Sequence, residues 1–323
     1  QTCALPIFPW GGYEQFRHSA WYGLTLFDLI FPSFLTLFGV SQALAYRNGV
    51  KWKRFWLRTV RLIIFGLLFN MVVDWSLDLQ TLRITSVLLL YAVLGVCTVA
   101  ITHFIKRWQS LLLLGMAISV SYLILLMVTS AGYPGGVPQP GFNLSGLIDT
   151  KIFGASHIYY QGSRGYDPEG VLNMYSALAN VLFGYAAGTI LYTKGIRRNV
   201  YLFFIGIGLI VTGYFFSDLL AFNKKIWTPS FALFTAGITI AVLSVLHTFF
   251  DYGFKWPRPV RGCLWYLEAF GRNSFLVYFG KMIVLALINN ISLLWLGIDK
   301  NISTFLLDSI QSVTNYHPKI FYA

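Results

Sequence analysis

Cysteine is scarce in this chain, with three residues in 323. Cys97 lies inside an apolar run, Cys263 beside a basic segment and Cys3 close to the start, so no two are placed to pair in one compartment. No spacing of cysteine and histidine is typical of a zinc site. We therefore expect neither a disulfide nor a bound metal.

Charged residues are also few, at 11% of the chain, whereas 56% of the residues are hydrophobic. With a mean hydropathy of +0.64, this composition excludes an ordinary soluble domain. Acidic residues are the scarcer sign, 12 against 24 Lys and Arg, so the net charge is +12. The basic residues gather in short connections between apolar runs, which argues against a nucleic-acid partner and for a lipid bilayer.

Apolar runs near 20 residues long fill most of the chain, and in lipid a helix satisfies its own backbone hydrogen bonds. We predict an all-α, polytopic integral membrane protein with about eight transmembrane helices. The predicted spans are 24–46, 59–74, 84–104, 109–130, 171–193, 200–217, 230–250 and 273–297.

The two ends of the sequence differ from the rest. Residues 1–7, Gln-Thr-Cys-Ala-Leu-Pro-Ile, match the in-frame translation of a sequencing adaptor, and we expect a non-native leader there. Residues 8–323 are expected to form a single membrane domain that is a fragment of a longer protein.

Lys and Arg concentrate in alternate connections, namely 47–58, 106–107, 194–198 and 255–261. The positive-inside rule assigns these connections to the cytoplasmic side. The opposite side holds nine of the twelve acidic residues and the one long loop, 131–170. We expect His18 and this loop to face the periplasm, across a bacterial inner membrane.

His18 precedes the first apolar run and Asp28 lies within it. Ionisable groups at or inside a membrane are costly to place, so both are candidate functional residues. Histidine can accept a proton from an amine near neutral pH or attack an acyl donor directly, and both roles suit acyl transfer. Ten residues span about 15 Å of continuous helix, so contact between the two requires a break, for which Gly23-Leu-Thr25 is suited. The alternatives are an interfacial histidine and a structural Asp28 paired with Arg61, Asn70 or Asn180.

The loop 131–170 begins with a segment, 132–141, whose proline and glycine density disfavours regular structure. Its second half interleaves aromatic and polar side chains, a combination that suits the apolar face and the hydroxyl edge of a sugar. The candidate acceptor-binding residues in it are His157, Tyr159, Asp167 and Glu169. The alternative is that Asp167-Pro168-Glu169 only forms the turn into the next helix.

A basic connection on the cytoplasmic side contains Arg47, Lys51, Lys53 and Arg54, together with two tryptophans. Such a segment offers positive charge for phosphates and aromatic surface for an adenine ring. We predict these four residues as a binding site for the nucleotide part of a donor. The alternative is an ordinary positive-inside loop with interfacial tryptophans.

Five sequence blocks carry a resemblance to a known family, and they follow one another in the order of that family. They are His18-Ser-Ala-Trp21-Tyr-Gly23-Leu-Thr25 with Asp28-Leu-Ile-Phe-Pro32, Gly165-Tyr-Asp167-Pro168-Glu169-Gly170, Ala179-Asn180-Val-Leu-Phe-Gly184-Tyr, Asn223-Lys224-Lys225-Ile-Trp227-Thr228, and Gly271-Arg272-Asn273. In these blocks the chain resembles the heparan-alpha-glucosaminide N-acetyltransferase family and its bacterial relatives, from about residue 10 to residue 280. It departs from the family pattern at 86–90, where relatives typically have a Gln-Arg pair.

The resemblance implies a transmembrane acyltransferase that takes acetyl from acetyl-CoA in the cytoplasm and delivers it to the amine of a glucosamine-type sugar or glycan outside. It implies His18 as the catalytic histidine and Asp28 as the acid of the same helix. Asn180, Lys225 and Trp227 are further candidate acceptor-binding residues, and the alternative for Lys225 and Trp227, which lie on the outer side, is a structural role. O-acetylation of a cell-envelope polysaccharide and small-molecule transport are the alternatives. A homodimer is compatible with the sequence.

Overall fold

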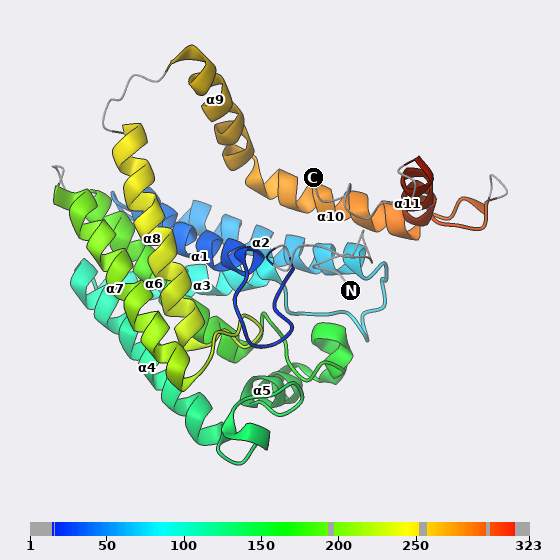
Figure 1. Ribbon diagram of the computed structural model, residues 1–323, viewed down its shortest axis with the longest axis horizontal. Helices are drawn as coiled ribbons and strands as arrows, with labels where there is room; N and C mark the ends of the chain where they lie inside the picture. The colour runs from blue at the N-terminus through cyan, green and yellow to red at the C-terminus, as the bar shows by residue number, and fades with distance from the viewer. Residues whose placement is uncertain (1–14, 16, 193–196, 252–256, 295–297, 314–323) are drawn as a thin grey trace. The chain divides into compact units, whose positions relative to one another are not determined.

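The computed structural model describes residues 15, 17–192, 197–251, 257–294 and 298–313, and the predicted leader 1–7 lies outside them. No β-strand occurs in these ranges, so the all-α prediction is confirmed. The α-helices of Figure 1 are α1 (Leu26–Ala45), α2 (Trp52–Val73), α3 (Val87–Phe104), α4 (Trp108–Ser130), α5 (Leu144–Phe153), α6 (Val171–Leu191), α7 (Arg197–Leu219), α8 (Pro229–Asp251), α9 (Arg258–Arg272), α10 (Ser274–Asn290) and α11 (Ile302–Val313).

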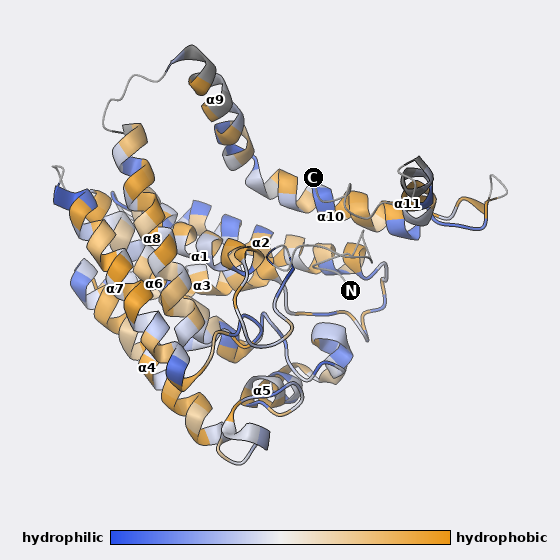
Figure 2. Cartoon of the chain, in the orientation of Figure 1, coloured by the Kyte–Doolittle hydropathy of each residue, from blue (hydrophilic) through white to orange (hydrophobic). Residues whose placement is uncertain are grey.

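Seven helices are long and apolar enough to cross a membrane, namely α1, α2, α3, α4, α6, α7 and α8. The bent pair α9 and α10 supplies an eighth span if the two helices are counted as one. Figure 2 shows the apolar residues running along these helices, as lipid-facing spans require. The prediction of about eight spans is therefore confirmed.

Two predicted boundaries are wrong by about two turns of helix. The last span was expected to end at 297, but α10 ends at Asn290. The second span was expected to begin at 59, with the basic residues before it in a loop, but α2 begins at Trp52. Lys and Arg are good helix formers, and their long side chains can carry the charge back to the membrane surface. Half of the basic connection is therefore helical.

The chain divides into two compact units. One contains His18–Leu67 and Leu79–Gly253, and the other contains Gln1–Arg17, Leu68–Asp78 and Phe254–Ala323. Within the second unit, the ring of Phe69 stacks on that of Tyr278 with 5.5 Å between centroids. All the candidate site residues lie in the first unit, which is described below.

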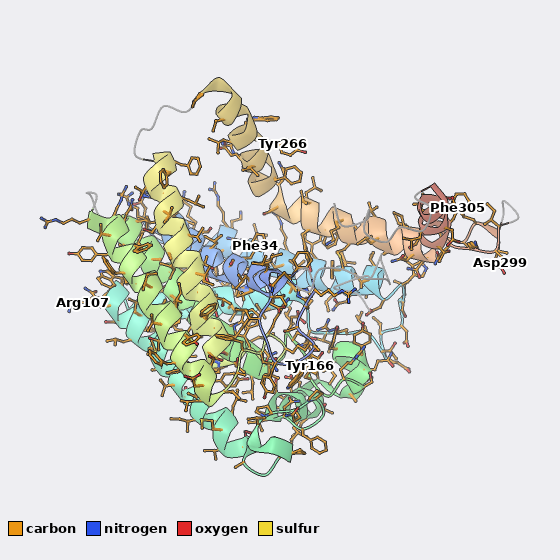
Figure 3. All side chains as sticks on the ribbon, viewed as in Figure 1. Phe34, Arg107, Tyr166, Tyr266, Asp299 and Phe305 are labelled. Atoms are coloured by element: carbon orange, nitrogen blue, oxygen red, sulfur yellow. The ribbon has the colours of Figure 1, made fainter. Side chains whose placement is uncertain are left out.

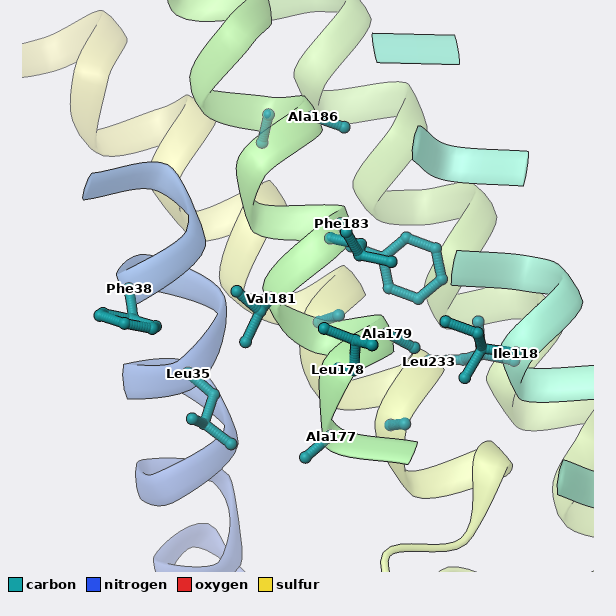
Figure 4. Packing of buried hydrophobic residues seen from close by; sticks show 14 of the residues in the cluster. Leu35, Phe38, Ile118, Ala177, Leu178, Ala179, Val181, Phe183, Ala186 and Leu233 are labelled. Carbon is teal, nitrogen blue, oxygen red and sulfur yellow. The ribbon is translucent and has the colours of Figure 1, made fainter. Parts of the chain in front are cut away.

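Helix α6 is the centre of the first unit and packs against α1, α3, α4 and α8. Its buried side chains meet α1 on one side and α4 on another (Figure 4). A Cβ atom on Gly184 would lie 1.8 Å from the Thr36 carbonyl oxygen, and one on Gly39 would lie 2.0 Å from the Val181 carbonyl oxygen. Helices α1 and α6 therefore cross in backbone contact, which small residues permit in membrane helices.

The loop 131–170 is more ordered than its sequence suggests. It contains a short 3₁₀ turn at Pro134–Gly136 and the helix α5, whose first turn is capped by the Asn143 side chain accepting from the Gly146 N–H at 2.8 Å. Tyr166 of this loop and Arg107, just before α4, lie at opposite ends of the helices of the first unit (Figure 3). The long loop and the basic connection before α4 thus occupy opposite ends.

Candidate active site

His18 and Asp28 lie in direct contact. The segment 18–25 is not helical, and α1 begins only at Leu26, so the chain before α1 folds back over the first turn of the helix. As a result the His18 Nδ1 atom lies 2.8 Å from Asp28 Oδ1. Gly23 has a positive φ of 127°, which glycine adopts without steric strain, and the chain reverses at the predicted break.

Asp28 is fully buried and every oxygen of its carboxylate is held. Oδ2 accepts hydrogen bonds from the Ser19 N–H at 3.2 Å, the Thr25 N–H at 3.2 Å and the Thr25 hydroxyl at 3.1 Å. Because a carboxylate only accepts hydrogen bonds, the contact with Oδ1 assigns the proton of a neutral His18 ring to Nδ1. The lone pair of Nε2 is then available for chemistry, on a side chain that retains 27% of its exposure.

The segment 18–25 is tied to two distant parts of the chain. The Trp21 indole N–H and the Tyr22 hydroxyl both donate to the Pro138 carbonyl, at 3.0 and 2.6 Å. The Gly23 N–H donates to the Phe222 carbonyl at 2.8 Å. The long loop and the connection between α7 and α8 therefore both close on the His18 segment.

Lys224 was not predicted as a site residue, yet its side chain contacts both members of the His18–Asp28 pair. Its Nζ atom is 3.1 Å from His18 Nδ1, 3.4 Å from His18 Nε2 and 3.6 Å from Asp28 Oδ1. Lys224 belongs to the Asn-Lys-Lys block, from which Lys225 was the predicted site residue, and nothing in the block distinguishes the two lysines. Only the fold shows which of the two reaches the histidine.

The adjacent Lys225 has a different environment. Its ammonium donates to the Ala20 carbonyl and lies 5.7 Å from the centre of the Tyr166 ring. Burial lowers the pKa of Lys225, and the nearby cations Arg164 and Lys224 lower it further. Lys225 therefore lies beside the His18 segment, as a residue bordering the site would.

Asn180 and Trp227 contact each other inside the core. The Trp227 indole N–H donates to Asn180 Oδ1 at 3.0 Å, and the Asn180 amide donates to the Ala232 carbonyl at 3.1 Å. Both side chains are closed off from solvent, at 0% and 1% exposure. They join α6 to the start of α8, so direct contact of either residue with an acceptor stays a prediction.

Asp167 and Glu169 share one cation, Arg83, which sequence reasoning missed. The Arg83 guanidinium lies 2.7 Å from Asp167 Oδ1 and 2.5 Å from Glu169 Oε2. The other oxygen of Asp167 accepts from the Thr85 hydroxyl at 2.5 Å and the Tyr159 N–H at 2.8 Å. Asp167 therefore has its hydrogen-bonding capacity filled by protein, which favours the turn-forming alternative for it.

The electrostatics of this cluster follow from its burial. Burial raises the pKa of Glu169, and the Arg83 guanidinium opposes that rise. Burial also disfavours the charged form of Arg83, but the two carboxylates more than offset it, so the pKa of Arg83 lies above its usual value. Nearby, burial raises the pKa of Asp149 to about 6.

His157 and Tyr159 fix the long loop to the segment before α3. His157 Nδ1 lies 2.8 Å from the Leu82 carbonyl oxygen, and the Ile84 N–H donates to the His157 carbonyl at 2.9 Å. The Arg83 guanidinium lies 4.7 Å from the centre of the Tyr159 ring. Both residues remain partly exposed, so they keep surface that a ligand can contact.

Replacing Arg83 with methionine is expected to destabilise the fold by about 3–5 kcal/mol, because it leaves two buried carboxylates without their cation. Thermal unfolding in detergent measures this as a marked fall in the transition temperature. The matched control is Arg164→Met, which removes an exposed arginine of the loop 131–170. Equal transition temperatures for the two variants would show that the cluster is not a source of stability.

The four predicted donor-binding residues separate in the structure. Lys51 and Arg54 line a hollow of about 280 Å³ at the C-terminal end of α1, together with Ala45, Tyr46, Phe55 and Arg58. Arg47 instead lies 5.3 Å from the centre of the Tyr192 ring, and Lys53 does not line the hollow. Arg58, which was not predicted, completes the cationic lining.

In the part of the chain that the structure describes, no three His, Cys, Asp or Glu side chains come together as metal ligands. What the fold and site define is a multi-pass membrane protein with a histidine–carboxylate pair at one end of a span and a cationic hollow at the other. The family model described as heparan-alpha-glucosaminide N-acetyltransferase, catalytic, matches residues 9–203. The chain belongs to that family.

Two curated relatives extend the similarity beyond the family match. The human heparan-alpha-glucosaminide N-acetyltransferase is 26% identical over 336 residues, covering 84% of this chain and 49% of the human protein. The mouse enzyme of the same name is 26% identical over 340 residues, covering 85% of this chain and 50% of the mouse protein. The chain therefore spans about half the length of the curated relatives it matches.

Proposed function

We propose that the protein is a transmembrane acetyltransferase that moves acetyl from acetyl-CoA to the amine of a glucosamine-type sugar. The observation that carries the proposal is the 2.8 Å contact between His18 and Asp28, in a chain whose family is described by N-acetyl transfer. The acceptor class comes from the names of the human and mouse relatives.

His18 can serve this reaction in two ways. As a base, Nε2 accepts the amine proton while the amine attacks the thioester carbon, and the departing CoA thiolate then takes the proton from the imidazole. As a nucleophile, Nε2 attacks the thioester carbon and displaces the thiolate, and the amine then attacks the acetyl-imidazole. Asp28 supports both routes, because it holds the Nδ1 proton and so orients Nε2 toward the substrate.

We assign the donor's phosphates to the hollow lined by Lys51, Arg54 and Arg58, with Arg47 and Lys53 as peripheral charges. Guanidinium groups bind phosphate through paired hydrogen bonds. Helix α1 has 20 residues, so the hollow and His18 lie about 30 Å apart along its axis. By the positive-inside rule, the donor would enter from the cytoplasm and the acceptor from the periplasm of a bacterial inner membrane.

We assign the acceptor to the surface formed by His157, Tyr159 and Lys225, which lie on the two segments that close on His18. Partly exposed aromatic and polar side chains suit a sugar ring. Asp167 and Glu169 would hold Arg83 by ion pairs, and Arg83 would in turn position the Tyr159 ring. Asn180 would hold the turn that carries Lys225, because it accepts a hydrogen bond from Trp227 of the same turn.

The test uses sealed membrane vesicles carrying the full-length gene product, with radiolabelled acetyl-CoA on the cytoplasmic face and glucosamine on the other. We expect labelled N-acetylglucosamine on the glucosamine side of the protein-containing vesicles. Vesicles from cells that lack the gene should form none. Label in a base-labile ester would support O-acetylation instead. Movement of glucosamine without acetylation would support transport and overturn the proposal.

A further inference from the structure

Lys224 lies beside His18, in a turn that follows Asn223. Asn223 holds the backbone around it, since its side-chain oxygen accepts from the Lys225 N–H at 2.8 Å and the Ile226 N–H at 3.2 Å. The Asn223 N–H in turn donates to the Thr228 hydroxyl at 2.9 Å. This local turn holds the backbone from which the Lys224 side chain reaches the pair.

The charges around the Lys224 ammonium favour its position beside the imidazole. Asp28 Oδ1 is 3.6 Å away, and Glu169 also interacts with Lys224 electrostatically. The side chain is 19% exposed, so these attractions are weakly screened by water. The cation thus lies beside the Asp28 carboxylate and within 3.4 Å of both nitrogens of His18.

Nδ1 of His18 is occupied by Asp28, so the nitrogen that reacts is Nε2, and Lys224 Nζ lies 3.4 Å from it. When Nε2 bonds to a carbonyl carbon, the carbonyl oxygen is two bonds away, about 2–3 Å from Nε2 by standard bond lengths. Groups that stabilise such an oxyanion lie about 2.7–3.1 Å from it. An ammonium 3.4 Å from Nε2 is therefore near enough to reach that oxygen with a hydrogen bond.

We propose that Lys224 donates a hydrogen bond to the carbonyl oxygen of the transferred acetyl group while that oxygen carries negative charge. This inference rests on the proposed function. The Nε2 lone pair forms the C–N bond and the carbonyl π electrons move to oxygen, next to Lys224. Their return breaks the C–S bond and expels the CoA thiolate. The amine then attacks the acetyl-imidazole, re-forming the oxyanion at the same place, and its collapse frees His18 while the amine proton passes to the thiolate.

The full-length protein is compared with Lys224→Met, Lys224→Arg and the control Lys151→Met, an exposed lysine of α5. We expect Lys224→Met to lower kcat about 10²–10³-fold, the usual effect of removing one oxyanion donor. The KM for acetyl-CoA should stay within about threefold, because the contact forms in the transition state. Lys224→Arg should recover part of kcat, since it restores a cationic donor, and Lys151→Met should match the unmodified protein.

Thermal unfolding of each variant separates this role from a structural one. A lowered kcat with an unchanged transition temperature and partial rescue by arginine supports the proposal. Unchanged kcat in Lys224→Met, or a loss confined to KM, or a loss that follows the transition temperature without arginine rescue, overturns it. If the unmodified protein transfers no acetyl at all, it is the proposed function that fails, whereas transfer at equal rates by the unmodified protein and Lys224→Met rejects Lys224 alone.

Discussion

In the His18→Ala variant, kcat for acetyl transfer to glucosamine is expected to be about 10²–10⁴-fold lower, the range that a positioned base or nucleophile contributes. The physical reason is that Nε2 is the ring nitrogen that does not face Asp28, so its lone pair can accept a proton or attack the acyl donor. Single-turnover assays in vesicles measure the chemical step directly.

Two further variants sharpen this prediction. Asp28→Asn is expected to lose nearly as much activity as His18→Ala, because an amide places a donor where the Nδ1 proton needs an acceptor. His103→Ala removes an exposed histidine at the end of α3 and should leave the rate unchanged. Full activity in His18→Ala, with the expected product, would remove the histidine from the mechanism.

The helices were largely predictable because each is encoded locally. Runs of about 20 apolar residues give the spans without knowledge of what they pack against. The start of α2 escaped prediction because the helix continues through basic residues, where hydropathy no longer reports helix formation. α5 escaped because its ten residues, Leu144–Phe153, lie in a loop whose glycine and proline content dominated the prediction.

The candidate site was predictable only where its residues are close in sequence. The break at Gly23 signalled that His18 could reach Asp28, and the structure brings them together. Arg83 and Lys224 come from segments far along the chain, and only the folded backbone places Arg83 beside Asp167 or Lys224 beside His18. Asn180 and Trp227 show the converse, because a motif that suggests binding can also encode a buried hydrogen bond, here between α6 and the turn before α8.

The second large effect is expected at the crossing of α1 and α6. Gly184→Ala adds a single methyl group whose carbon would lie 1.8 Å from the Thr36 carbonyl oxygen. Backbone cannot yield as a flexible side chain can, so the two helices must separate, and overpacking of this kind costs about 1–3 kcal/mol or more. We expect a sharply lower transition temperature and loss of the monodisperse peak in size-exclusion chromatography.

The matched control is Gly208→Ala in α7, where an added Cβ meets nothing within 4 Å. Alanine is the better helix former by about 1 kcal/mol, so this variant should be neutral or slightly more stable, opposite in sign to Gly184→Ala. α1 carries Asp28, which lies 3.6 Å from Lys224, and the turn containing Asp167 and Glu169 leads into α6. A milder opening of the crossing would therefore also shift Asp28 relative to this turn. Wild-type stability in Gly184→Ala would contradict the backbone contact itself, and with it the idea that this crossing sets the geometry around His18.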